Sequence, residues 1–511
     1  MMTAPMGQQG FTLRKLCAGI LAIPAEADRE LSRLVLDSRT VRSGDVFIAL
    51  QGHRVDAMDF IDEAVAKGAV AVLWQAATTV SPVPVTYRVG VNGHLVPIIA
   101  VKQLFRLVGI LADRFYQHPS KKMHVIGVTG TNGKTSCSHY LAQVLSDEHE
   151  QACGLMGTLG TGRIGHLQST QNTTPDALTC HQLLAEMQQQ GVTDVAMEVS
   201  SHALVQYRVA GIKFDGAIFT NLTHEHLDYH GSMQAYGEAK QRLFDLPDLR
   251  YSIINVDDAF GRALVTHLKT RDISLLTYGL QSEHSPQIVA TDIQLSASGI
   301  HMQVKTPAGN TSLQVPLLGR FNASNVLAVL AVLLQHGLRL EEATQRLGKI
   351  TAVPGRMQVI SSNCNFQVVV DYAHTPDALE QALSSLREHT RGKLYCIFGC
   401  GGERDTAKRP VMGRLASELA DVSIITNDNP RHEDPIQILD EIIGGVDINK
   451  RHHIRVIADR RQAIATAIAQ AQAGDVILIA GKGHEDYQII GNERHAFSDC
   501  GVASELLQGQ G

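Results

Sequence analysis

Three features are scarce or missing in this sequence of 511 residues. The eight cysteines include no C-x-x-C pair, and in a chain of this length that usage predicts reduced thiols and a cytoplasmic protein. No apolar run approaches the length of a transmembrane helix, so we expect no stable membrane association. The balance of 45 basic against 51 acidic residues gives a net charge of -6, which offers no electrostatic basis for binding nucleic acid.

The length of the chain indicates several domains, because 511 residues are more than one hydrophobic core usually holds. We place one boundary near His118-Pro119, since proline disfavours helix in the residue before it, and a second near Val353-Pro354. The predicted domains are residues 1–120, 121–352 and 353–511. The sequence has neither a convincing repeat shared by these domains nor a low-complexity tail.

Short apolar runs alternate with helical patterns through most of the sequence, which predicts mostly parallel sheets with helices on both faces. We therefore predict an α/β protein. The central strands are VIGVT, DVAMEV, GAIFTN and YSIINV, and the C-terminal strands are QVVVDYA, KLYCIFGCGG, DVSIITND and DVILIAGKG. Between them, PLLGRFNASNVLAVLAVLLQ predicts a strand end, a turn over 319–322 and a long apolar helix.

The N-terminal segment imitates a signal peptide, because a basic pair precedes the short apolar run LCAGILAI. The basic pair starts late in the chain, and this favours an amphipathic helix instead. Its apolar face would comprise Leu13, Leu16, Cys17, Ile20 and Leu21.

A strand, a glycine turn and a helix meet at residues 125–136, VIGVTGTNGKTS, the context in which a phosphate-binding loop is credible. Gly130 and Gly133 let the backbone approach phosphate oxygens, so that N–H groups and the helix N-terminus face the anion. Lys134 adds a cation near the outer phosphates, and the Thr135 hydroxyl can bind Mg²⁺. The pattern predicts an ATP site.

The spacing of this loop departs from the usual pattern, because Val128 stands where a further glycine is expected. The loop is a shortened G-x-x-G-K-T variant. A tight turn in a dehydrogenase-like or purely structural unit is the alternative interpretation. Lysine and threonine directly after the glycine have no simple structural purpose there, and this favours ATP.

Polar residues follow other central strands at their carboxyl ends, where ligands collect in parallel sheets. Glu198 closes DVAMEV and could supply a Mg²⁺ ligand beside Thr135. His226 could bind a second ion, an arrangement that suits phosphoryl transfer.

Two alternatives stay open for the residues that follow GAIFTN. His224, His226, His230 and Asp228 could bind zinc, although their spacing lacks the H-E-x-x-H pattern of a zinc helix. Lys240 has the spacing of an ordinary solvated lysine on a helix.

Three C-terminal strands end in charged or flexible segments. Asp428-Asn429-Pro430-Arg431 follows one strand, and the rigid proline lets Arg431 present a guanidinium fork that suits a carboxylate. The segments 401–404 and 481–485 end two others, and between them they offer another cation, flexible backbone and an acid able to hold an ammonium group. Such a pocket suits a zwitterionic amino acid that carries an extra carboxylate.

Ten segments resemble, in order, the signatures of the Mur ligases of peptidoglycan synthesis: GVTGTNGKTS, MEVSSHAL, NLTHEHLDYHG, YGEAKQRLF, GRFNASN, VPGRMQ, DYAHTPDAL, GCGGERDTAKRP, DNPRHEDP and AGKGHEDYQ. The resemblance spans nearly the whole chain. It implies an ATP-dependent amide ligase that adds meso-diaminopimelate to UDP-N-acetylmuramoyl-L-alanyl-D-glutamate. The three domains would bind the UDP-sugar, ATP and the amino acid, the last on a Rossmann-like fold. Glu403 and the segment 223–225 depart from the residues usual in the family.

The resemblance also implies roles for residues. Lys240 matches a lysine that the family carbamylates, and the carbamate would bind Mg²⁺ together with Thr135, Glu198 and His226. The ATP site would comprise Gly130, Thr131, Asn132, Gly133, Lys134, Thr135 and Ser136, with Asn322, Arg356 and Asp371 across the domain junction. The uridine nucleotide would contact Leu36, Ser38, His53, Arg54 and Val55. The muramoyl-dipeptide would contact Asn172, Thr173, Thr174, Ser200, Gln206 and Arg208. The diaminopimelate site would comprise Arg404, Asp428, Asn429, Pro430, Arg431, Gly481 and Glu485, with Arg431 deciding between diaminopimelate and lysine.

The implied reaction has two steps, activation of the D-glutamyl carboxylate as an acyl phosphate and attack by the amine of diaminopimelate. Lys134, Glu198, His226 and carbamylated Lys240 are the expected catalytic residues, and closure of the third domain would assemble the site. We expect a monomer whose partners are small molecules. A ligase that adds lysine, a folylpolyglutamate-type ligase and a non-catalytic ATP-binding regulator are the rival interpretations. Arg431 and the N-terminal domain argue against the first two, and the intact catalytic set argues against the third.

Overall fold

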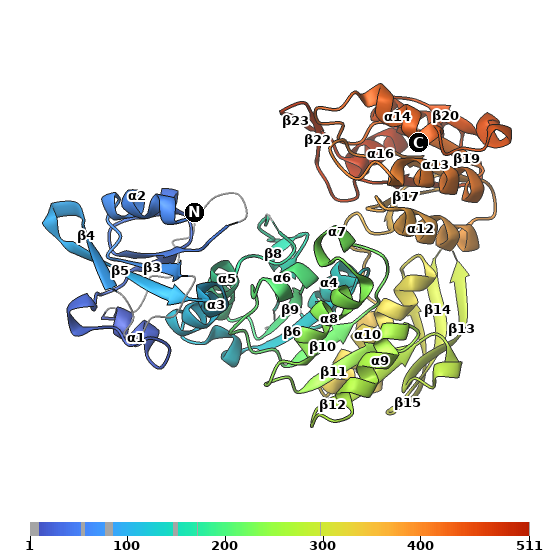
Figure 1. Cartoon of the computed structure of the whole chain (residues 1–511). Coiled ribbons are helices and arrows are strands. Elements are labelled where there is room, and N and C mark those ends of the chain that lie inside the picture. The colour runs from blue at the N-terminus through green and yellow to red at the C-terminus, as the bar shows by residue number, and fades with distance from the viewer. Residues whose placement is uncertain are drawn as a thin grey trace. The chain divides into compact units, whose positions relative to one another are not determined.

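The structure is a computed structural model that describes residues 10–52, 57–76, 85–146, 152–170, 172–296 and 298–509 (Figure 1). The chain divides into two compact units, residues 1–277 and 278–511. The boundary between the units falls within strand β12 (Ser274–Gly279). The three domains predicted from the sequence, with boundaries near residues 120 and 352, stay a prediction.

An N-terminal sheet opens the first unit, with strand order β1-β2-β3-β5-β4. Its strands are β1 (Arg33–Val35), β2 (Asp45–Ala49), β3 (Ala71–Ala76), β4 (Val85–Val89) and β5 (Leu95–Lys102). Only β4 runs antiparallel to its neighbour. Alternate residues of β2 face opposite sides, so that Val46 and Ile48 enter one apolar cluster while Phe47 and Ala49 enter another. The accompanying helices are α1 (Leu13–Cys17), α2 (Ile61–Ala66), α3 (Leu104–Phe115), and the short 3₁₀ turns η1 (Ala25–Ala27), η2 (Ser38–Thr40), η3 (Ala57–Phe60), η4 (Val91–Gly93) and η5 (Pro119–Lys122).

Helix α1 is shorter than the sequence predicted. Leu13, Leu16 and Cys17 are buried as expected, but the helix ends at Cys17, so Ile20 and Leu21 do not extend its apolar face. The backbone N–H groups of Ile20 and Leu21 both donate to the Cys17 carbonyl. The intervening Gly19 has a φ of 72°, a left-handed conformation that terminates helices.

The central sheet of the first unit places β6 (His124–Thr129) among parallel neighbours, in the order β11-β10-β6-β9-β7-β8. The chain passes from β6 to β7 and β9 on one side and then crosses to β10 and β11 on the other. The carboxyl end of β6 is therefore a topological switch point, where ligands bind in such sheets. The other strands are β7 (Cys153–Gly157), the antiparallel β8 (Gly160–Arg163), β9 (Asp194–Glu198), β10 (Gly216–Phe219) and β11 (Tyr251–Asn255). The helices are α4 (Lys134–Val144), α5 (Ala177–Gln189), α6 (Ser201–Val205), α7 (Leu227–His230), α8 (Met233–Phe244) and α9 (Ala259–Leu268).

The second unit begins with an antiparallel ribbon and a buried helix. The ribbon comprises β13 (Ile288–Ser296), β14 (Gly299–Thr306) and β15 (Gly309–Val315), preceded by η6 (Ser282–His284). Helices α10 (Arg320–Gln335) and α11 (Leu340–Leu347) follow. The predicted turn over 319–322 is wrong, because only Gly319 lies outside the helix and residues 320–322 form its first turn. The helix extends to Arg320 because Gly319, with a φ of 87°, makes the change of direction alone.

The C-terminal sheet of the second unit has the order β16-β17-β21-β18-β19-β20, and only β16 is antiparallel. Its strands are β16 (Gln358–Ile360), β17 (Gln367–Asp371), β18 (Leu394–Phe398), β19 (Val422–Ile425), β20 (Ile454–Val456) and β21 (Val476–Ala480). Leu478 packs with helices α12 (Pro376–His389), α13 (Lys408–Leu419) and α14 (Pro435–Ile443) on one face. Ile477 packs with α15 (Arg460–Gln470) and α16 (Asp499–Gln508) on the other. The turn η7 (Ile448–His453) and the hairpin β22 (Tyr487–Ile490) and β23 (Glu493–Ala496) complete the unit.

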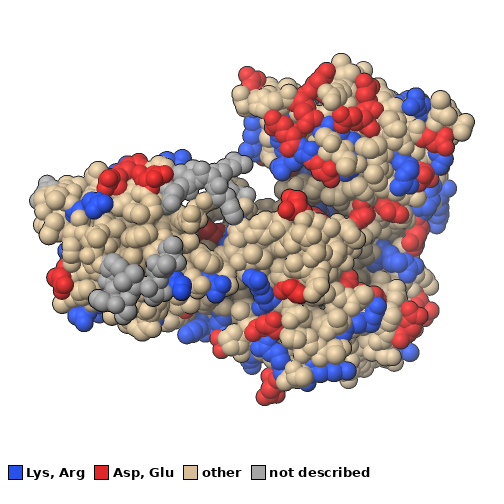
Figure 2. All heavy atoms as spheres, viewed as in Figure 1, with Lys and Arg blue, Asp and Glu red and all other residues tan. Residues whose placement is uncertain are grey.

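These sheets confirm the predicted α/β class, with a parallel central sheet and a Rossmann-like C-terminal sheet covered on both faces. On the face drawn in Figure 2, acidic and basic side chains are interspersed rather than gathered by sign. Within the described ranges, none of the helices combines the length and apolar character that spanning a bilayer requires.

Burial of His139 in α4 predicts that stability depends on pH. This side chain is 4% exposed, neither ring nitrogen has a hydrogen-bond partner among the described residues, and burial lowers its pKa from 6.5 to about 4. Between these pH values the unfolded chain binds more protons than the folded one, so stability falls as the pH drops from 6.5 to 4. This loss amounts to about 3 kcal/mol in the free energy of unfolding, and His139→Leu should not show it.

Urea unfolding at pH 7.5 and at pH 4.5 measures this effect. The exposed His94, changed to leucine, controls for the loss of one imidazole. An equal loss of stability in wild type and His139→Leu would contradict the assignment.

Candidate functional site

The glycine loop after β6 adopts the backbone that a phosphate site needs. Gly130 has a φ of 151°, and Gly133, which caps α4, has a φ of 88°. A Cβ built on Gly130 would lie 1.9 Å from Thr220 Oγ1, so only glycine fits at this position. The N-terminus of the eleven-residue helix α4 therefore opens directly onto the loop.

Two lysines converge on one carbonyl of this loop. Lys134 Nζ donates to the carbonyls of Gly130 and Thr131, at 2.9 and 2.7 Å. Lys240 Nζ, from α8, donates to the same Gly130 carbonyl at 2.7 Å and lies 4.3 Å from the ring centroid of Tyr236. The loop thus concentrates positive charge where an anion would bind.

Lys240 is not the solvated surface lysine that its spacing suggested. Only 1% of the residue is exposed, because α8 turns it toward the sheet rather than outward. Burial, and after it the nearby Lys134 ammonium, holds the pKa of Lys240 well below its usual value. Lys240 is therefore more often the neutral amine, which is the nucleophilic form, than a surface lysine is.

The structure brings Thr135 and Glu198 together from α4 and the end of β9. Thr135 Oγ1 donates to Glu198 Oε2 at 3.0 Å. Thr158 also holds this carboxylate, through its hydroxyl at 3.1 Å and its backbone N–H at 2.8 Å. Glu198 is 1% exposed. A buried hydroxyl and a carboxylate side by side are the hard oxygen donors that Mg²⁺ prefers.

Three histidines lie near the glycine loop: His202 is in α6, His226 directly precedes α7 and His230 is in α7. The ring centroids of His202 and His226 lie 4.8 Å apart, and those of His202 and His230 lie 5.4 Å apart. Burial lowers the pKa of His226, which favours the neutral imidazole that can bind a metal. Across the part of the chain that the structure describes, the predicted zinc group of His224, His226, His230 and Asp228 does not bring three ligand atoms within 4.8 Å of one another.

The residues predicted to contact the muramoyl-dipeptide mostly lie together next to Glu198. Thr174 Oγ1 donates to the Glu198 carbonyl at 2.8 Å, and Arg208 Nη1 donates to the Thr174 carbonyl at 2.9 Å. Gln206 Oε1 accepts from Arg208 Nε and Nη2 at 2.9 and 2.6 Å. Thr173, through Thr158 at 3.0 Å, and Ser200, whose backbone N–H donates to Thr174 Oγ1 at 3.1 Å, join the same group. Asn172 precedes it on an exposed segment.

The residues predicted for the uridine nucleotide are described only in part. Leu36 packs against the N-terminal core, and the buried Ser38 hydroxyl donates to Glu63 Oε2 at 2.8 Å. His53, Arg54 and Val55 lie outside the described residues. Their predicted role stays a prediction.

In the second unit, the structure brings together two of the three further residues predicted for ATP. Asp371, at the end of β17, accepts from the backbone N–H groups of Met357 and Ala373 at 2.7 and 2.8 Å. Burial raises the pKa of Asp371, although the neighbouring Arg356 partly opposes this. The Arg356 guanidinium lies 4.5 Å from the ring centroid of Tyr372. Its Nε is buried and has no hydrogen-bond partner among the described residues.

The third of these residues, Asn322, lies in the first turn of α10. It is 2% exposed, and its Nδ2 donates to the Leu318 carbonyl at 2.7 Å. Leu318 and Met357 share one apolar cluster, which connects the start of α10 to the Arg356 segment within this unit.

In the segment that follows β19, Arg431 has a left-handed backbone, with a φ of 53°. Its Nη1 donates to the Gly402 carbonyl at 2.7 Å, and its backbone N–H donates to the Ile489 carbonyl at 3.1 Å. A Cβ built on Gly401 would lie 3.1 Å from Arg431 Nη1 and 3.9 Å from Arg404 Cγ. The two predicted arginines therefore flank the same stretch of backbone.

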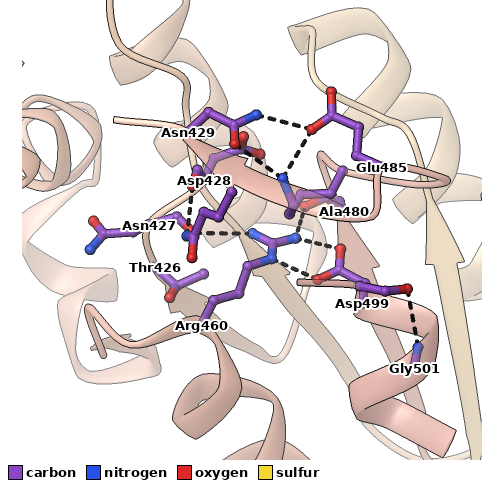
Figure 3. A network of polar contacts seen from close by, with 12 residues as sticks. Thr426, Asn427, Asp428, Asn429, Arg460, Ala480, Glu485, Asp499 and Gly501 are labelled. Atoms are coloured by element: carbon purple, nitrogen blue, oxygen red, sulfur yellow. Dashed lines mark hydrogen bonds and ion pairs between the residues drawn. The ribbon is translucent and has the colours of Figure 1, made fainter. Parts of the chain in front are cut away.

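A carboxylate and its partners occupy the end of β21 nearby (Figure 3). Glu485 Oε2 accepts from Asn429 Nδ2 and from Lys482 Nζ, both at 2.9 Å. Lys482 also donates to Asn429 Oδ1 at 3.2 Å. The segments that follow β19 and β21 thus share one polar network, as the sequence predicted, although β18 lies between the two strands in the sheet.

Asp428 completes this group because Gly481 permits a close approach. Gly481 has a φ of 115°, and a Cβ built on it would lie 2.8 Å from Asp428 Oδ2. Any side chain at position 481 would therefore displace the carboxylate.

Sequence reasoning included Lys482 only as part of the segment 481–485, and it missed two further buried cations around these strand ends, Arg409 and Arg460. Arg409 binds Glu433 and Glu441, each at 2.7 Å, and donates to the Gly401 carbonyl at 3.2 Å. All three side chains are fully buried. The position of Lys482 directly after Gly481 was the one available signal, because the two arginines lie within ordinary helical patterns.

Comparisons with known proteins give the family. Three family models match the chain: the Mur ligase family, catalytic domain over residues 30–116, the Mur ligase middle domain over 128–333, and the Mur ligase, glutamate ligase domain over 355–483. The chain belongs to the Mur ligase family.

Among relatives, the UDP-N-acetylmuramoyl-L-alanyl-D-glutamate–2,6-diaminopimelate ligase of Chromobacterium violaceum is 46% identical, over 94% of this chain and 95% of that protein. A solved structure with the same enzyme name has a TM-score of 0.71 and 35% identity, and covers 98% of this chain and 99% of its own. The MurF ligase of Thermotoga maritima in complex with ADP, at 18% identity, shares the fold with a TM-score of 0.61 over 96% of this chain and 99% of its own.

The glycine loop yields a prediction for nucleotide binding. Gly130→Ala should displace the loop, because the new Cβ meets Thr220 Oγ1 at 1.9 Å, and ATP affinity should fall at least about tenfold. Gly165→Ala is the matched control, since Gly165 also has a positive φ, of 89°, but its Cβ would meet nothing within 4 Å. Calorimetric titration with ATP measures both variants, and an unchanged affinity in Gly130→Ala would show that the loop does not hold phosphate.

Proposed function

We propose that this protein is an ATP-dependent ligase that joins meso-diaminopimelate to the D-glutamyl carboxylate of UDP-N-acetylmuramoyl-L-alanyl-D-glutamate during synthesis of peptidoglycan precursors. One observation carries the proposal: 46% identity over 94% of the chain to a relative whose name states these two reactants. Because the reaction consumes ATP, we place it in the cytoplasm. We also propose that the enzyme acts as a monomer.

In the first step, an oxygen of the D-glutamyl carboxylate attacks the γ-phosphorus of ATP, the bond to the bridging oxygen breaks, and ADP leaves. The acyl phosphate remains as the activated acceptor. Negative charge on the transferring group needs positive charge close by. Lys134 and the N-terminus of α4 supply it, which the convergence of Lys134 and Lys240 on the Gly130 carbonyl supports.

Thr135, Glu198, His226 and a carbamate on Lys240 would hold Mg²⁺. When bound, Mg²⁺ neutralises charge on the phosphate oxygens. The buried Thr135–Glu198 pair fits this ion, because both groups are hard oxygen donors. The carbamate would form when the neutral Lys240 amine adds carbon dioxide and releases a proton. The lowered pKa of this amine supports that step.

Three further residues would contact ATP. Asn322 would contact the base, Arg356 the phosphates and Asp371 the ribose. The buried Arg356 Nε supports this assignment, because within the described residues it is a donor without an acceptor. Thr131, Asn132, Gly133 and Ser136 would add loop contacts to the phosphates.

The acceptor would lie along the first unit. Arg208, held by Gln206, is the cation available to the dipeptide, and Thr173, Thr174, Ser200 and Asn172 would add polar contacts. The uridine nucleotide would contact Leu36, Ser38 and residues 53–55.

In the second step, the amine of diaminopimelate attacks the acyl carbon, loses a proton and expels phosphate. Arg431 and Arg404 would grip a carboxylate of the amino acid, and Asp428 and Glu485 would hold an ammonium group, with Asn429, Pro430 and Gly481 shaping the pocket. The flanking of Gly401 by both arginines supports this arrangement. The acyl phosphate and the amine must meet for the amide to form, and we propose that domain closure achieves this.

A phosphate-release assay tests the reaction. Release should require ATP, the muramoyl-dipeptide nucleotide and diaminopimelate together, and lysine should replace diaminopimelate poorly. Lys134→Ala should lower the rate by about 10²–10³-fold, because it removes charge next to the transferring phosphate. Release without the amine, or full activity of Lys134→Ala, would refute the mechanism. Faster turnover with lysine than with diaminopimelate would instead indicate the sister ligase.

We expect Arg431 to determine which amino acid the enzyme selects. Arg431→Ala should raise KM for diaminopimelate by about 10–100-fold, the cost of a charge-assisted hydrogen bond, and leave KM for ATP nearly unchanged. Arg431→Lys is the matched control, since it keeps the charge but loses the fork, and should give an intermediate KM. Initial rates at varied diaminopimelate decide the matter, and an unchanged KM in Arg431→Ala would exclude the carboxylate clamp.

A further inference from the structure

Arg460 is a wholly buried cation at the first turn of α15. Its guanidinium forms a bidentate ion pair with Asp499 at the start of α16, from Nε at 2.7 Å and from Nη2 at 2.8 Å. Neither side chain is exposed. Figure 3 shows Arg460 reaching between Asp499 on one side and Asn427 on the other.

The remaining contacts of the guanidinium are backbone carbonyls at two strand ends. Nη2 donates to the Ala480 carbonyl, at the end of β21, at 2.8 Å. Nη1 lies 3.5 Å from the Asn427 carbonyl, just beyond β19. Each carbonyl belongs to the residue directly before one assigned to the amino-acid pocket, Gly481 in one case and Asp428 in the other.

The guanidinium also lies directly behind the pocket. A Cβ built on Gly481 would lie 2.8 Å from Asp428 Oδ2 and 4.0 Å from Arg460 Nη2. Burial alone would lower the pKa of Arg460, but the carboxylates of Asp499, Asp428 and Glu485 raise it. Arg460 thus offsets part of the negative charge that the pocket presents to an ammonium group.

Stability alone does not account for this pair. A buried ion pair costs several kcal/mol per ion in desolvation, and apolar replacements of similar volume are often no less stable. Helices α15 and α16 already pack through Ile464, Ala467 and Val502. The ion pair of Arg461 and Glu505 joins the same two helices at the surface. Other contacts already hold the two helices together, and the buried pair therefore adds mainly directional hydrogen bonds.

We propose that Arg460, held by Asp499, is a positioning residue for the amino-acid pocket and fixes the end of β19 against the end of β21. The proposal rests on the function proposed above. With this spacing fixed, Asp428 and Glu485 lie ready for the ammonium group of the incoming amino acid. Without it, the pocket must be ordered on binding, which weakens affinity for the amino acid but not for ATP.

The test compares Arg460→Lys and Asp499→Asn with Arg461→Lys in the full-length protein. Arg460→Lys keeps a cation but loses the planar fork that reaches Asp499 and both carbonyls. We expect KM for diaminopimelate to rise at least about tenfold in both test variants, while KM for ATP and for the muramoyl-dipeptide nucleotide changes less than about twofold. Arg461→Lys should match wild type in all three.

Thermal melts and the wild-type assay separate the possible failures. If wild type releases no phosphate with diaminopimelate, the proposed function fails, whereas active wild type with unchanged KM in Arg460→Lys overturns the positioning role alone. A proportionate change in all three KM values, or in melting temperature only, would reveal a purely structural pair. Failure of both test variants to fold would have the same meaning and would also overturn the proposal.

Discussion

The Gly130 carbonyl accepts hydrogen bonds from two lysines, Lys134 and Lys240, and the character of the first site follows from this contact. Two ammonium groups that share one acceptor repel each other, and burial strengthens the repulsion because water screens it poorly. Such a site is stabilised by anions. Phosphate oxygens between the lysines would relieve the repulsion, and conversion of Lys240 to a carbamate would remove one cation altogether. Burial is the main reason that the pKa of Lys240 is lowered, and repulsion by the Lys134 ammonium lowers it further.

The C-terminal strand ends carry negative groups where the glycine loop carries positive ones. There the carboxylates of Asp428 and Glu485 follow the ends of β19 and β21, and buried cations lie near them. Lys482 binds Glu485 directly, whereas Arg460 acts through Asp499 and the backbone.

Both sites lie at the carboxyl ends of parallel strands, and both depend on glycine at the closest approach. Gly130 admits Thr220, and Gly481 admits Asp428, each at a distance where a side chain would collide. The strands themselves are held by apolar clusters on both faces of the C-terminal sheet, so that polar groups can be reserved for its edge. This division of labour explains how ordinary α/β sheets support charged groups that would be costly within a core.

The sequence by itself determined the parallel strands, the phosphate loop and the strand ends that carry polar residues, because apolar periodicity and glycine position are local properties. VIGVT lies within β6, the DVAME part of DVAMEV forms β9 and the VILIA part of DVILIAGKG forms β21, and Thr135 contacts Glu198 as expected. Predictions from local sequence patterns were wrong where the surrounding structure determines the position of a residue. The spacing around Lys240 predicted a solvated side chain, the 319–322 turn became the start of α10, and Ile20 and Leu21 fell outside α1. Only the tertiary structure revealed Arg460 and Asp499, since they are 39 residues apart and their pairing depends on how α15 and α16 pack on the sheet.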